Sequence, residues 1–270
     1  MSTFDPTTVP VRDAATVMLV RSGPAGPEVL MQRRTLKAAF VGGFYVFPGG
    51  AIDESDRDGS LERLASGLTD AQASRRLGVA TGGLASWVAA VRECFEEAGV
   101  LLADNRDGRP VRFDDPLVAA RFGGHRTALH DGRISLAELC GLEGLRLALA
   151  RLHYVSHWVT PTGEKRRFDT RFFVGEAPAA QTPLHDDRET IDTIWISPAE
   201  ALARNERGEL SMIVPTIRNL QFLASYADLA GVIAAARAVV DPPTIQPRMS
   251  RVGDDLQILL PGDTGFEEAG

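Results

Sequence analysis

The nine residues from Arg92 to Val100 constrain this chain more than any other stretch, and they read Arg-Glu-Cys-Phe-Glu-Glu-Ala-Gly-Val. They end an apolar pattern that begins near Leu84 and repeats at about 100° per residue, which is the spacing of an α-helix. The apolar residues on one face of that helix are Leu84, Trp87, Val88, Val91, Phe95 and Ala98. Glu93, Glu96 and Glu97 fall on the opposite face. The pattern therefore predicts a helix that buries one stripe and presents three carboxylates together.

The three carboxylates admit two interpretations. Like charges three and four residues apart on a helix repel one another, and a cation among them would remove that repulsion. Hard divalent ions such as magnesium are bound by oxygen ligands of this kind. The alternative is a solvated acidic face without a ligand, which is what most glutamate clusters are. Gly99 is placed to end the helix, and Arg92 lies one turn before Glu96 and can pair with it.

A second string lies upstream, and together the two resemble a known family. Residues 47–53 read Phe-Pro-Gly-Gly-Ala-Ile-Asp, a turn that leads out of a short apolar run. The Nudix box has the order Gly, five residues, Glu, seven residues, Arg-Glu, two residues, Glu-Glu, one residue, Gly. The string that starts at Arg92 resembles its second half, and residues 47–53 resemble the turn that opens it.

The box is interrupted in this chain. Asp56 is the sixth residue after Gly50, where the family usually has Glu, and Arg92 follows it by 36 residues instead of eight, so about 28 residues are inserted. We expect two short helices in this insertion, at 60–66 and 69–77, and its role could be a lid over the substrate or an oligomer contact. This split box resembles a Nudix subgroup that includes peroxisomal coenzyme A diphosphatases. The strings His-Trp-Val-Thr-Pro at 157–161 and Arg-Phe-Asp-Thr-Arg-Phe-Phe at 167–173 also resemble that subgroup.

The resemblance implies a metal site and a catalytic base. In the family, the carbonyl at the position of Gly50 and the glutamates at the positions of Glu93, Glu96 and Glu97 bind Mg²⁺, for which Mn²⁺ may substitute. The base is the glutamate after the arginine, here Glu93, or a carboxylate from a distant loop. Glu189 is our candidate for the loop carboxylate, with Asp186 and Asp187 behind it, and an acidic loop without function is the alternative.

Three arginines are candidate ligands of a substrate phosphate, because the guanidinium fork matches phosphate oxygens. Arg33 and Arg34 end a predicted strand, and Arg167 shares a strand face with Arg171. Surface charge is the alternative for each. The lone His157 is more often a structural hydrogen-bonding residue than a catalytic one.

Charge and composition exclude several classes of partner. The net charge of −7 argues against a nucleic-acid polymer or an anionic membrane as the partner. No run of 18 apolar residues predicts a membrane span. Two cysteines form no disulfide framework, and Cys94 is expected to be a buried small side chain. The first twelve residues do not resemble a signal peptide, and the last four do not resemble a peroxisomal address, so we expect a cytoplasmic protein. A homodimer is possible.

The order of predicted elements favours an α+β fold. Residues 14–20 and 28–33 form a predicted hairpin, and strands are predicted at 145–160, 167–174 and 191–196. Helices are predicted at 115–130, 198 onward, 213–224 and 226–239. Strands and helices do not alternate regularly, so a doubly wound parallel sheet is excluded. The resemblance implies the Nudix α/β/α sandwich, a mixed sheet between helices with extra C-terminal helices, and we expect one domain at residues 10–265.

The expected function is hydrolysis of a diphosphate linkage in a nucleoside diphosphate derivative. By resemblance to the subgroup, the first substrate to consider is coenzyme A or acyl-CoA, cut to 3',5'-ADP and (acyl-)phosphopantetheine. NADH, an ADP-sugar or a nucleotide is the alternative substrate. From a different class, the chain could be a Nudix module that binds a nucleotide without turnover, but Arg92, Glu93, Glu96 and Glu97 argue against this.

Overall fold

A mixed β-sheet forms the centre of the molecule. The computed structural model describes residues 8–36, 41–252 and 255–269. In that part of the chain, the sheet has eight strands with the main order β10-β7-β8-β1-β2-β3, while β4 pairs with β1 and β9 with β2. The strands are β1 (Val11–Gly23), β2 (Gly26–Arg34), β3 (Tyr45–Val46), β4 (Gly49–Ala51), β7 (His153–Val159), β8 (Arg167–Glu176), β9 (Thr190–Ile196) and β10 (Thr244–Ile245). The long β1 runs parallel to β8 and antiparallel to β2 and β4.

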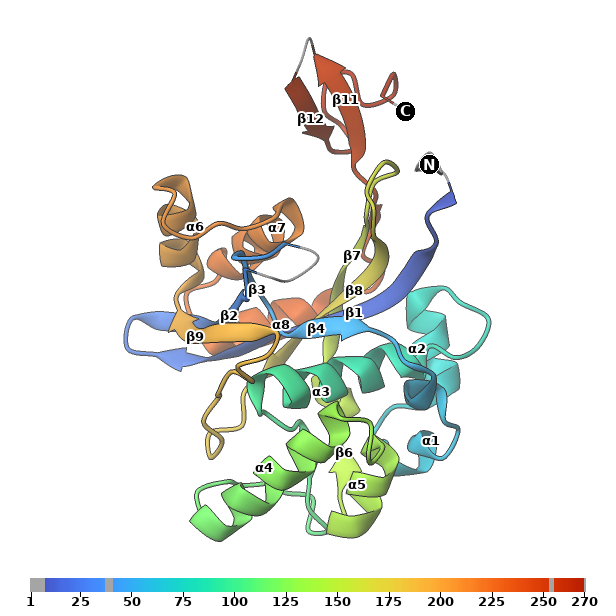
Figure 1. Cartoon of the computed structure of the whole chain (residues 1–270), viewed down its shortest axis with the longest axis vertical. Coiled ribbons are helices and arrows are strands. Elements are labelled where there is room, and N and C mark those ends of the chain that lie inside the picture. Colours follow the sequence, from blue (N-terminus) through green and yellow to red (C-terminus); the bar gives the residue numbers. More distant parts are fainter. Residues whose placement is uncertain (1–7, 37–40, 253–254, 270) are drawn as a thin grey trace.

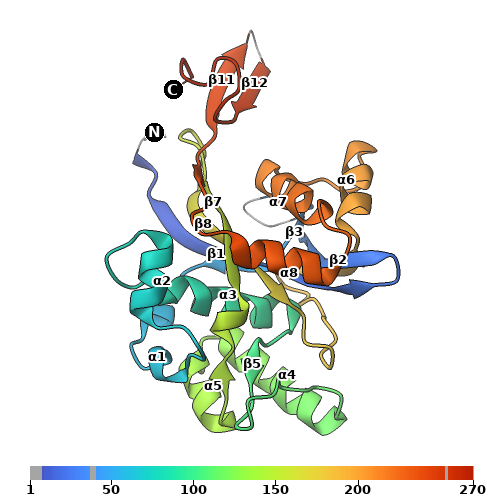
Figure 2. The same cartoon turned by 180° about the vertical axis from the view of Figure 1, so that it is seen from behind.

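Helices cover both faces of this sheet. One face carries the short 3₁₀ helices η2 (Glu54–Arg57) and η3 (Leu149–Arg151) and the helices α1 (Leu61–Leu64), α2 (Asp70–Leu77), α3 (Leu84–Ala98), α4 (Pro116–His130) and α5 (Leu136–Glu143). The other face carries α6 (Pro198–Glu206), α7 (Val214–Ala224) and α8 (Leu229–Ala238), and Figure 2 shows α8 lying across it. The result is the predicted α/β/α sandwich.

Alternating side chains of β1 divide the core into two layers. Val17 and Leu19 pack in the layer below α3, whereas Met18 and Val20 pack in the layer with α7 and α8. Successive side chains of a strand point to opposite faces, so both faces of this strand must be apolar. Trp87 of α3 is fully buried in the first layer, as the helical pattern predicted.

The predicted elements are confirmed apart from one strand. Residues 145–160 are not one strand: β6 (Arg146–Leu147) pairs with the short β5 (Ala103–Asp104), η3 follows, and only β7 enters the main sheet. Periodicity alone does not distinguish a strand from a helical segment in a short apolar run such as the one that contains η3, which is why the sequence prediction was wrong here. The limits of 10–265 for a single domain stay a prediction.

The insertion in the box forms α1 and α2 as predicted, and it packs into the core. Leu61, Ala65, Leu68 and Ala73 are buried in the layer that contains α3. Thr69 caps α2, because its hydroxyl accepts the backbone N–H of Gln72. The insertion is therefore a structural part of this layer, whatever else it contributes.

The C-terminal residues form a hairpin outside the main sheet. Strands β11 (Arg248–Val252) and β12 (Asp255–Leu259) pair with each other and project from the body (Figure 1). Arg248 is hydrogen-bonded to the carbonyls of Phe266 and Glu267, which fixes the last turn of the chain to the hairpin. No helix in the described residues is long and apolar enough to cross a membrane.

Candidate active site

Helix α3 carries the three glutamates and ends where the sequence predicted. Gly99 adopts a left-handed backbone conformation with φ of 68°, and its N–H donates to the carbonyl of Phe95. Glycine takes this conformation without a steric penalty, so it terminates the helix directly after the carboxylates. The last turn of α3 is thus fixed in both length and direction.

Arg92 lies at the centre of the site. Its Nε and Nη2 donate to the two carboxylate oxygens of Asp56 at 2.9 and 2.8 Å. Its Nη1 donates to Glu93 Oε1 at 2.8 Å and to Glu96 Oε2 at 3.1 Å, and Nη2 also donates to the carbonyl of Ala51 at 2.8 Å. The two half-boxes therefore meet through one guanidinium. The predicted pairing with Glu96 is confirmed, but the sequence did not identify Asp56 as the main partner of Arg92.

Glu97 is more buried than the sequence pattern predicted. It lies on the polar side of the helix, yet only 3% of the residue is exposed, because the start of β4 covers it. The backbone N–H of Gly49 donates to Glu97 Oε2 at 2.9 Å. A Cβ at Gly49 would lie 2.5 Å from the backbone carbonyl oxygen of Ala15, so only glycine fits at this position. A Cβ at Gly50 would lie 2.5 Å from Oε1 of Glu93 and would displace that side chain. The two glycines thus let the start of β4 lie against the end of α3.

The loop carboxylate Glu189 reaches the same region through Arg34. Nη2 of Arg34 lies 3.2 Å from Glu189 Oε2, and Nη1 lies 3.7 Å from Glu97 Oε1. The Nε of Arg34 is buried without a hydrogen-bond partner. Asp186, the second loop candidate, accepts hydrogen bonds from the backbone of Arg188, Glu189 and Thr190, so it shapes the loop. The structure therefore brings Glu189, and not Asp186, toward the carboxylates of α3.

Burial raises the pKa values of all three glutamates, and a neighbouring glutamate adds to the shift of Glu93 and of Glu97. Burial, and then the charge of Glu96, raise the pKa of Glu93 to about 7, although Arg92 opposes the shift. Burial, followed by the charge of Glu93, raises the pKa of Glu97 well above its usual range. Burial also raises the pKa of Glu96. When they are ionised, these three carboxylates carry more negative charge than the positive charges of Arg92 and Arg34 neutralise.

We expect the ionisation of Glu93 to lower the stability of the metal-free protein as the pH rises from about 4.5 to about 7. A group whose pKa is higher in the folded state stabilises it fully below the unfolded value, and this contribution is lost as the pH rises through the folded value. Glu93 therefore destabilises the fold progressively across that window. Thermal melting in EDTA over this range, on wild type and Glu93→Gln, measures the effect.

His153 acts in the opposite direction, because burial lowers its pKa and its contribution grows with pH. The quantity to compare is therefore the difference in melting temperature between wild type and Glu93→Gln. We expect the melting temperature of wild type to fall relative to that of Glu93→Gln as the pH rises. A difference that stayed constant between pH 4.5 and 7 would contradict the assigned environment of Glu93.

The other predicted residues have different partners. Arg33 donates from Nε to the carbonyl of Gly43 at 3.4 Å, and Arg167 donates to the carbonyl of Thr160 at 3.2 Å. In the described part of the chain, neither arginine has an interaction with the carboxylates of α3. Their role as phosphate ligands stays a prediction, supported less by the geometry than that of Arg34.

His157 has a structural environment. Its Nε2 is hydrogen-bonded to Asp169, and its Nδ1 lies 2.8 Å from the hydroxyl of Thr244. The residue thus ties β7 to β8 and β10, as the structural interpretation predicted. Cys94 is fully buried on α3, and burial raises the pKa of its thiol. It is the buried small side chain that was expected.

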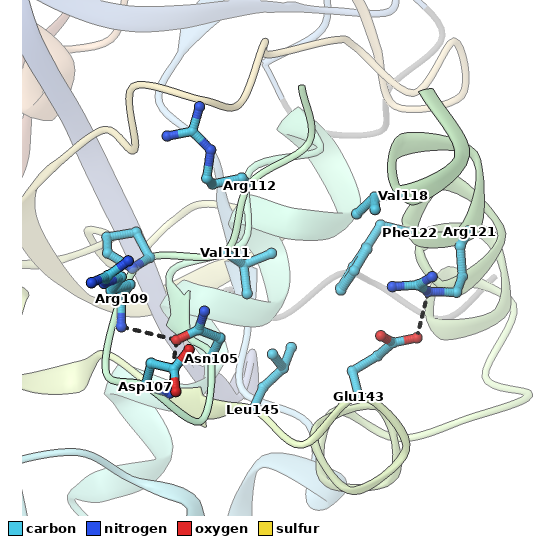
Figure 3. A pocket seen from close by; sticks show the side chains of 11 residues that line it. Asn105, Asp107, Arg109, Val111, Arg112, Val118, Arg121, Phe122, Glu143 and Leu145 are labelled. Carbon is cyan, nitrogen blue, oxygen red and sulfur yellow. Dashed lines mark hydrogen bonds and ion pairs between the residues drawn. The ribbon is translucent and has the colours of Figure 1, made fainter. Parts of the chain in front are cut away.

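Two pockets among the described residues lie away from the carboxylates. One of about 320 Å³ lies between α4 and the segment that follows β5 (Figure 3). Phe122, Val111 and Leu145 line it, and a pair between Arg121 and Glu143 closes one side. A second cavity, of about 340 Å³, is lined by Arg151 and the residues after β8. Neither cavity is lined by a residue predicted for the site, and we assign no function to them.

The carboxylates do not converge on one point as they stand. Within the described ranges, no three acidic, histidine or cysteine side chains are grouped closely enough to hold a cation. The reason is local, because Glu93 and Glu96 are turned to Arg92 and Glu97 is turned to the N–H of Gly49. The predicted metal ligands lie near one another, but their side chains point to other partners. Their use as metal ligands stays a prediction.

Comparisons with known proteins find a matching family model, related sequences and a related structure. The family model described as the NUDT19 Nudix domain matches residues 11–223. The acyl-coenzyme A diphosphatase NUDT19 of Gallus gallus is 28% identical over an alignment 305 positions long, which covers 95% of this chain and 80% of that protein. The human protein of the same name is 29% identical over an alignment 284 positions long, which covers 92% of this chain and 75% of that protein. A crystal structure of a Nudix hydrolase from Alicyclobacillus acidocaldarius superposes with a TM-score of 0.70 at 28% identity, covering 87% of this chain and 99% of that one.

Proposed function

This chain belongs to the NUDT19 Nudix domain family, and from that premise we propose that it hydrolyses the diphosphate linkage of coenzyme A or acyl-CoA. The products are 3',5'-ADP and phosphopantetheine or its acyl form. The name of the relatives, acyl-coenzyme A diphosphatase, supports this substrate class. The observation that carries the proposal is the guanidinium of Arg92, which joins Asp56 to Glu93 and Glu96 across the insertion.

The donor set of the site is of the kind that a divalent cation prefers, and we propose Mg²⁺, with Mn²⁺ as a substitute, once the side chains turn from their present partners. Glu93, Glu96, Glu97 and the carbonyl of Gly50 would hold it. Carboxylate and carbonyl oxygens are the ligands that such ions prefer. Burial raises the pKa values of Glu93 and Glu97, and the charge of Glu96 on Glu93 and of Glu93 on Glu97 adds to the shift, so a cation near them would relieve an unfavourable charge. When bound, the ion neutralises the diphosphate and lowers the pKa of a water.

The side chains of this chain would then orient the carboxylates and accept a proton from the attacking water. Arg92 fixes the carboxylates of Glu93 and Glu96 in one direction relative to the Gly49–Gly50 turn. Glu93 is our first candidate for the base, because its carboxylate lies beside the proposed ion and accepts a hydrogen bond from Arg92, and the glutamate after the arginine takes this role in the family that the chain resembles. Glu189 is the second candidate, since its half-exposed carboxylate can reach a substrate from the loop.

Arg34 is the candidate ligand of a substrate phosphate that the geometry supports best. Its guanidinium lies between Glu97 and Glu189 and keeps a buried Nε–H without an acceptor. An unused donor of a buried guanidinium carries a desolvation cost, which an incoming phosphate oxygen would remove. Arg34 would therefore place the diphosphate next to the carboxylates.

A turnover screen tests this function. We expect Mg²⁺-dependent release of 3',5'-ADP from coenzyme A and acetyl-CoA, with products separated by chromatography. The panel should also contain NADH, ADP-ribose and deoxynucleoside triphosphates. If one of these compounds is hydrolysed and the CoA compounds are not, the proposed diphosphatase activity stands and the proposed substrate is wrong. Ligand binding in a thermal-shift assay without turnover of any compound would favour a non-catalytic nucleotide-binding module.

A further inference from the structure

A second arginine contacts the carboxylate-bearing turn, from outside the box. Arg126 lies on α4, which packs beside the C-terminal end of α3 (Figure 1). Its Nε donates to the backbone carbonyl of Glu96 at 2.9 Å, and its Nη2 donates to the carbonyl of Glu97 at 2.8 Å. The last carbonyls of a helix have no partner within the helix, and a cation is favoured there. Arg126 therefore completes the end of α3 at the two residues whose side chains face the site.

Two further residues, Gln32 and Gly99, lie around the contact between Arg126 and the end of α3. The side-chain amide of the fully buried Gln32, on β2, donates to the same Glu97 carbonyl at 2.9 Å, so that both lone pairs of this oxygen are used. A Cβ at Gly99 would lie 3.1 Å from Nη1 of Arg126. Gly99 thus ends the helix and also leaves room for the guanidinium. The turn is held from α4 on one side and from the sheet on the other.

Helix α4 also contacts the loop that carries Glu189. Asp131, directly after α4, accepts a hydrogen bond at 2.8 Å from Nη1 of Arg188. The same loop is tied to the end of α3, because the N–H of Leu184 donates to the carbonyl of Ala98 at 2.9 Å. One element outside the box therefore fixes both groups of carboxylates, those of α3 and that of Glu189, relative to each other.

We propose that Arg126 is a positioning residue for the site, acting through the backbone of Glu96 and Glu97. This inference rests on the proposed function, since it assumes that these carboxylates bind a divalent ion. Arg126 fixes the direction in which the Glu96 and Glu97 side chains leave the helix, as partners of metal ligands commonly do. Its guanidinium contacts the backbone carbonyls of the proposed ligands, and we assign it no contact with the substrate.

The test is direct Mn²⁺ binding by the full-length protein, measured by isothermal titration calorimetry without substrate. We expect Arg126→Ala to weaken Mn²⁺ binding by about ten- to a hundredfold, the usual scale for loss of a residue that orients metal ligands. The kcat on the best substrate of the screen should fall while KM changes little, because no substrate contact is removed. Arg126→Lys, which keeps the charge but loses the fork, should restore part of the affinity.

Arg121→Ala is the matched control, because Arg121 lies on the same helix but pairs with Glu143. It should bind Mn²⁺ as wild type does. A lower melting temperature with unchanged Mn²⁺ affinity in Arg126→Ala would reduce Arg126 to a structural residue and overturn the proposal. If that variant does not fold, Arg126→Gln is judged by the same criterion. Failure of wild type itself to bind Mn²⁺ would instead overturn the proposed function.

Discussion

Glu97→Gln should abolish most turnover while leaving the fold at least as stable as in wild type. Removing one charge-stabilising group at a reaction centre typically lowers kcat by about a hundred- to a thousandfold. The amide keeps the shape of the side chain, and its oxygen can still accept the N–H of Gly49. Because burial and the charge of Glu93 raise the pKa of Glu97, the carboxylate is unfavourable in the metal-free fold, and the amide removes that charge.

The measurements are Mg²⁺-dependent turnover and thermal melting in EDTA. Glu206→Gln, an exposed glutamate at the end of α6, serves as the control and should change neither. Turnover near the wild-type value in Glu97→Gln would remove Glu97 from the proposed ligands. A loss of turnover together with a large fall in melting temperature would show a structural effect instead.

Asp56→Asn should destabilise the protein by about 3 kcal/mol and lower turnover at the same time. The side chain of Asp56 is 1% exposed and lies 2.8 Å from Nη2 of Arg92. Removing one partner of a buried ion pair typically costs about 3–5 kcal/mol, because the other charge stays buried. Glu93 and Glu96 would then be the close carboxylate partners left to Arg92, and a stronger attraction to Arg92 would turn them further away from the proposed metal ion.

Asp53→Asn is the matched control for this prediction. Asp53 also faces Arg92, at 3.7 Å, but its side chain is 60% exposed, so solvent screens the pair. Urea unfolding in EDTA should show a large loss for Asp56→Asn and a small one for Asp53→Asn. Equal effects of the two substitutions would mean that the buried pair does not hold the half-boxes together.

The sequence predicted the parts of the site that depend on local pattern. The helix at 84–98, its stop at Gly99 and the pairing of Arg92 with Glu96 follow from helical spacing and glycine conformation. The hairpin of β1 and β2 and the start of α6 at Pro198 follow in the same way, from residue patterns close in the chain. Each of these depends on residues that are close in the chain.

The sequence could not predict what covers the polar side of α3. A helical wheel places Glu97 away from the helix's own apolar stripe, but it does not show that the Gly49 turn closes over it. The donation of Arg126 to the carbonyls of Glu96 and Glu97 involves a helix about 30 residues away, and no local pattern marks that arginine. Such contacts are set by the packing of whole elements, which only the structure gives.

The insertion between the half-boxes also determines when the site can assemble during folding. Oδ1 of Asp70 on α2 accepts the N–H of Leu84, and Ser74 Oγ accepts that of Gly83, so residues of the insertion cap the start of α3. Extending the connection from eight residues to 36 costs only about 1 kcal/mol of closure entropy. The first turn of α3 should therefore become protected from amide hydrogen exchange only when α2 docks. The carboxylate helix and the insertion would then fold and open as one cooperative unit.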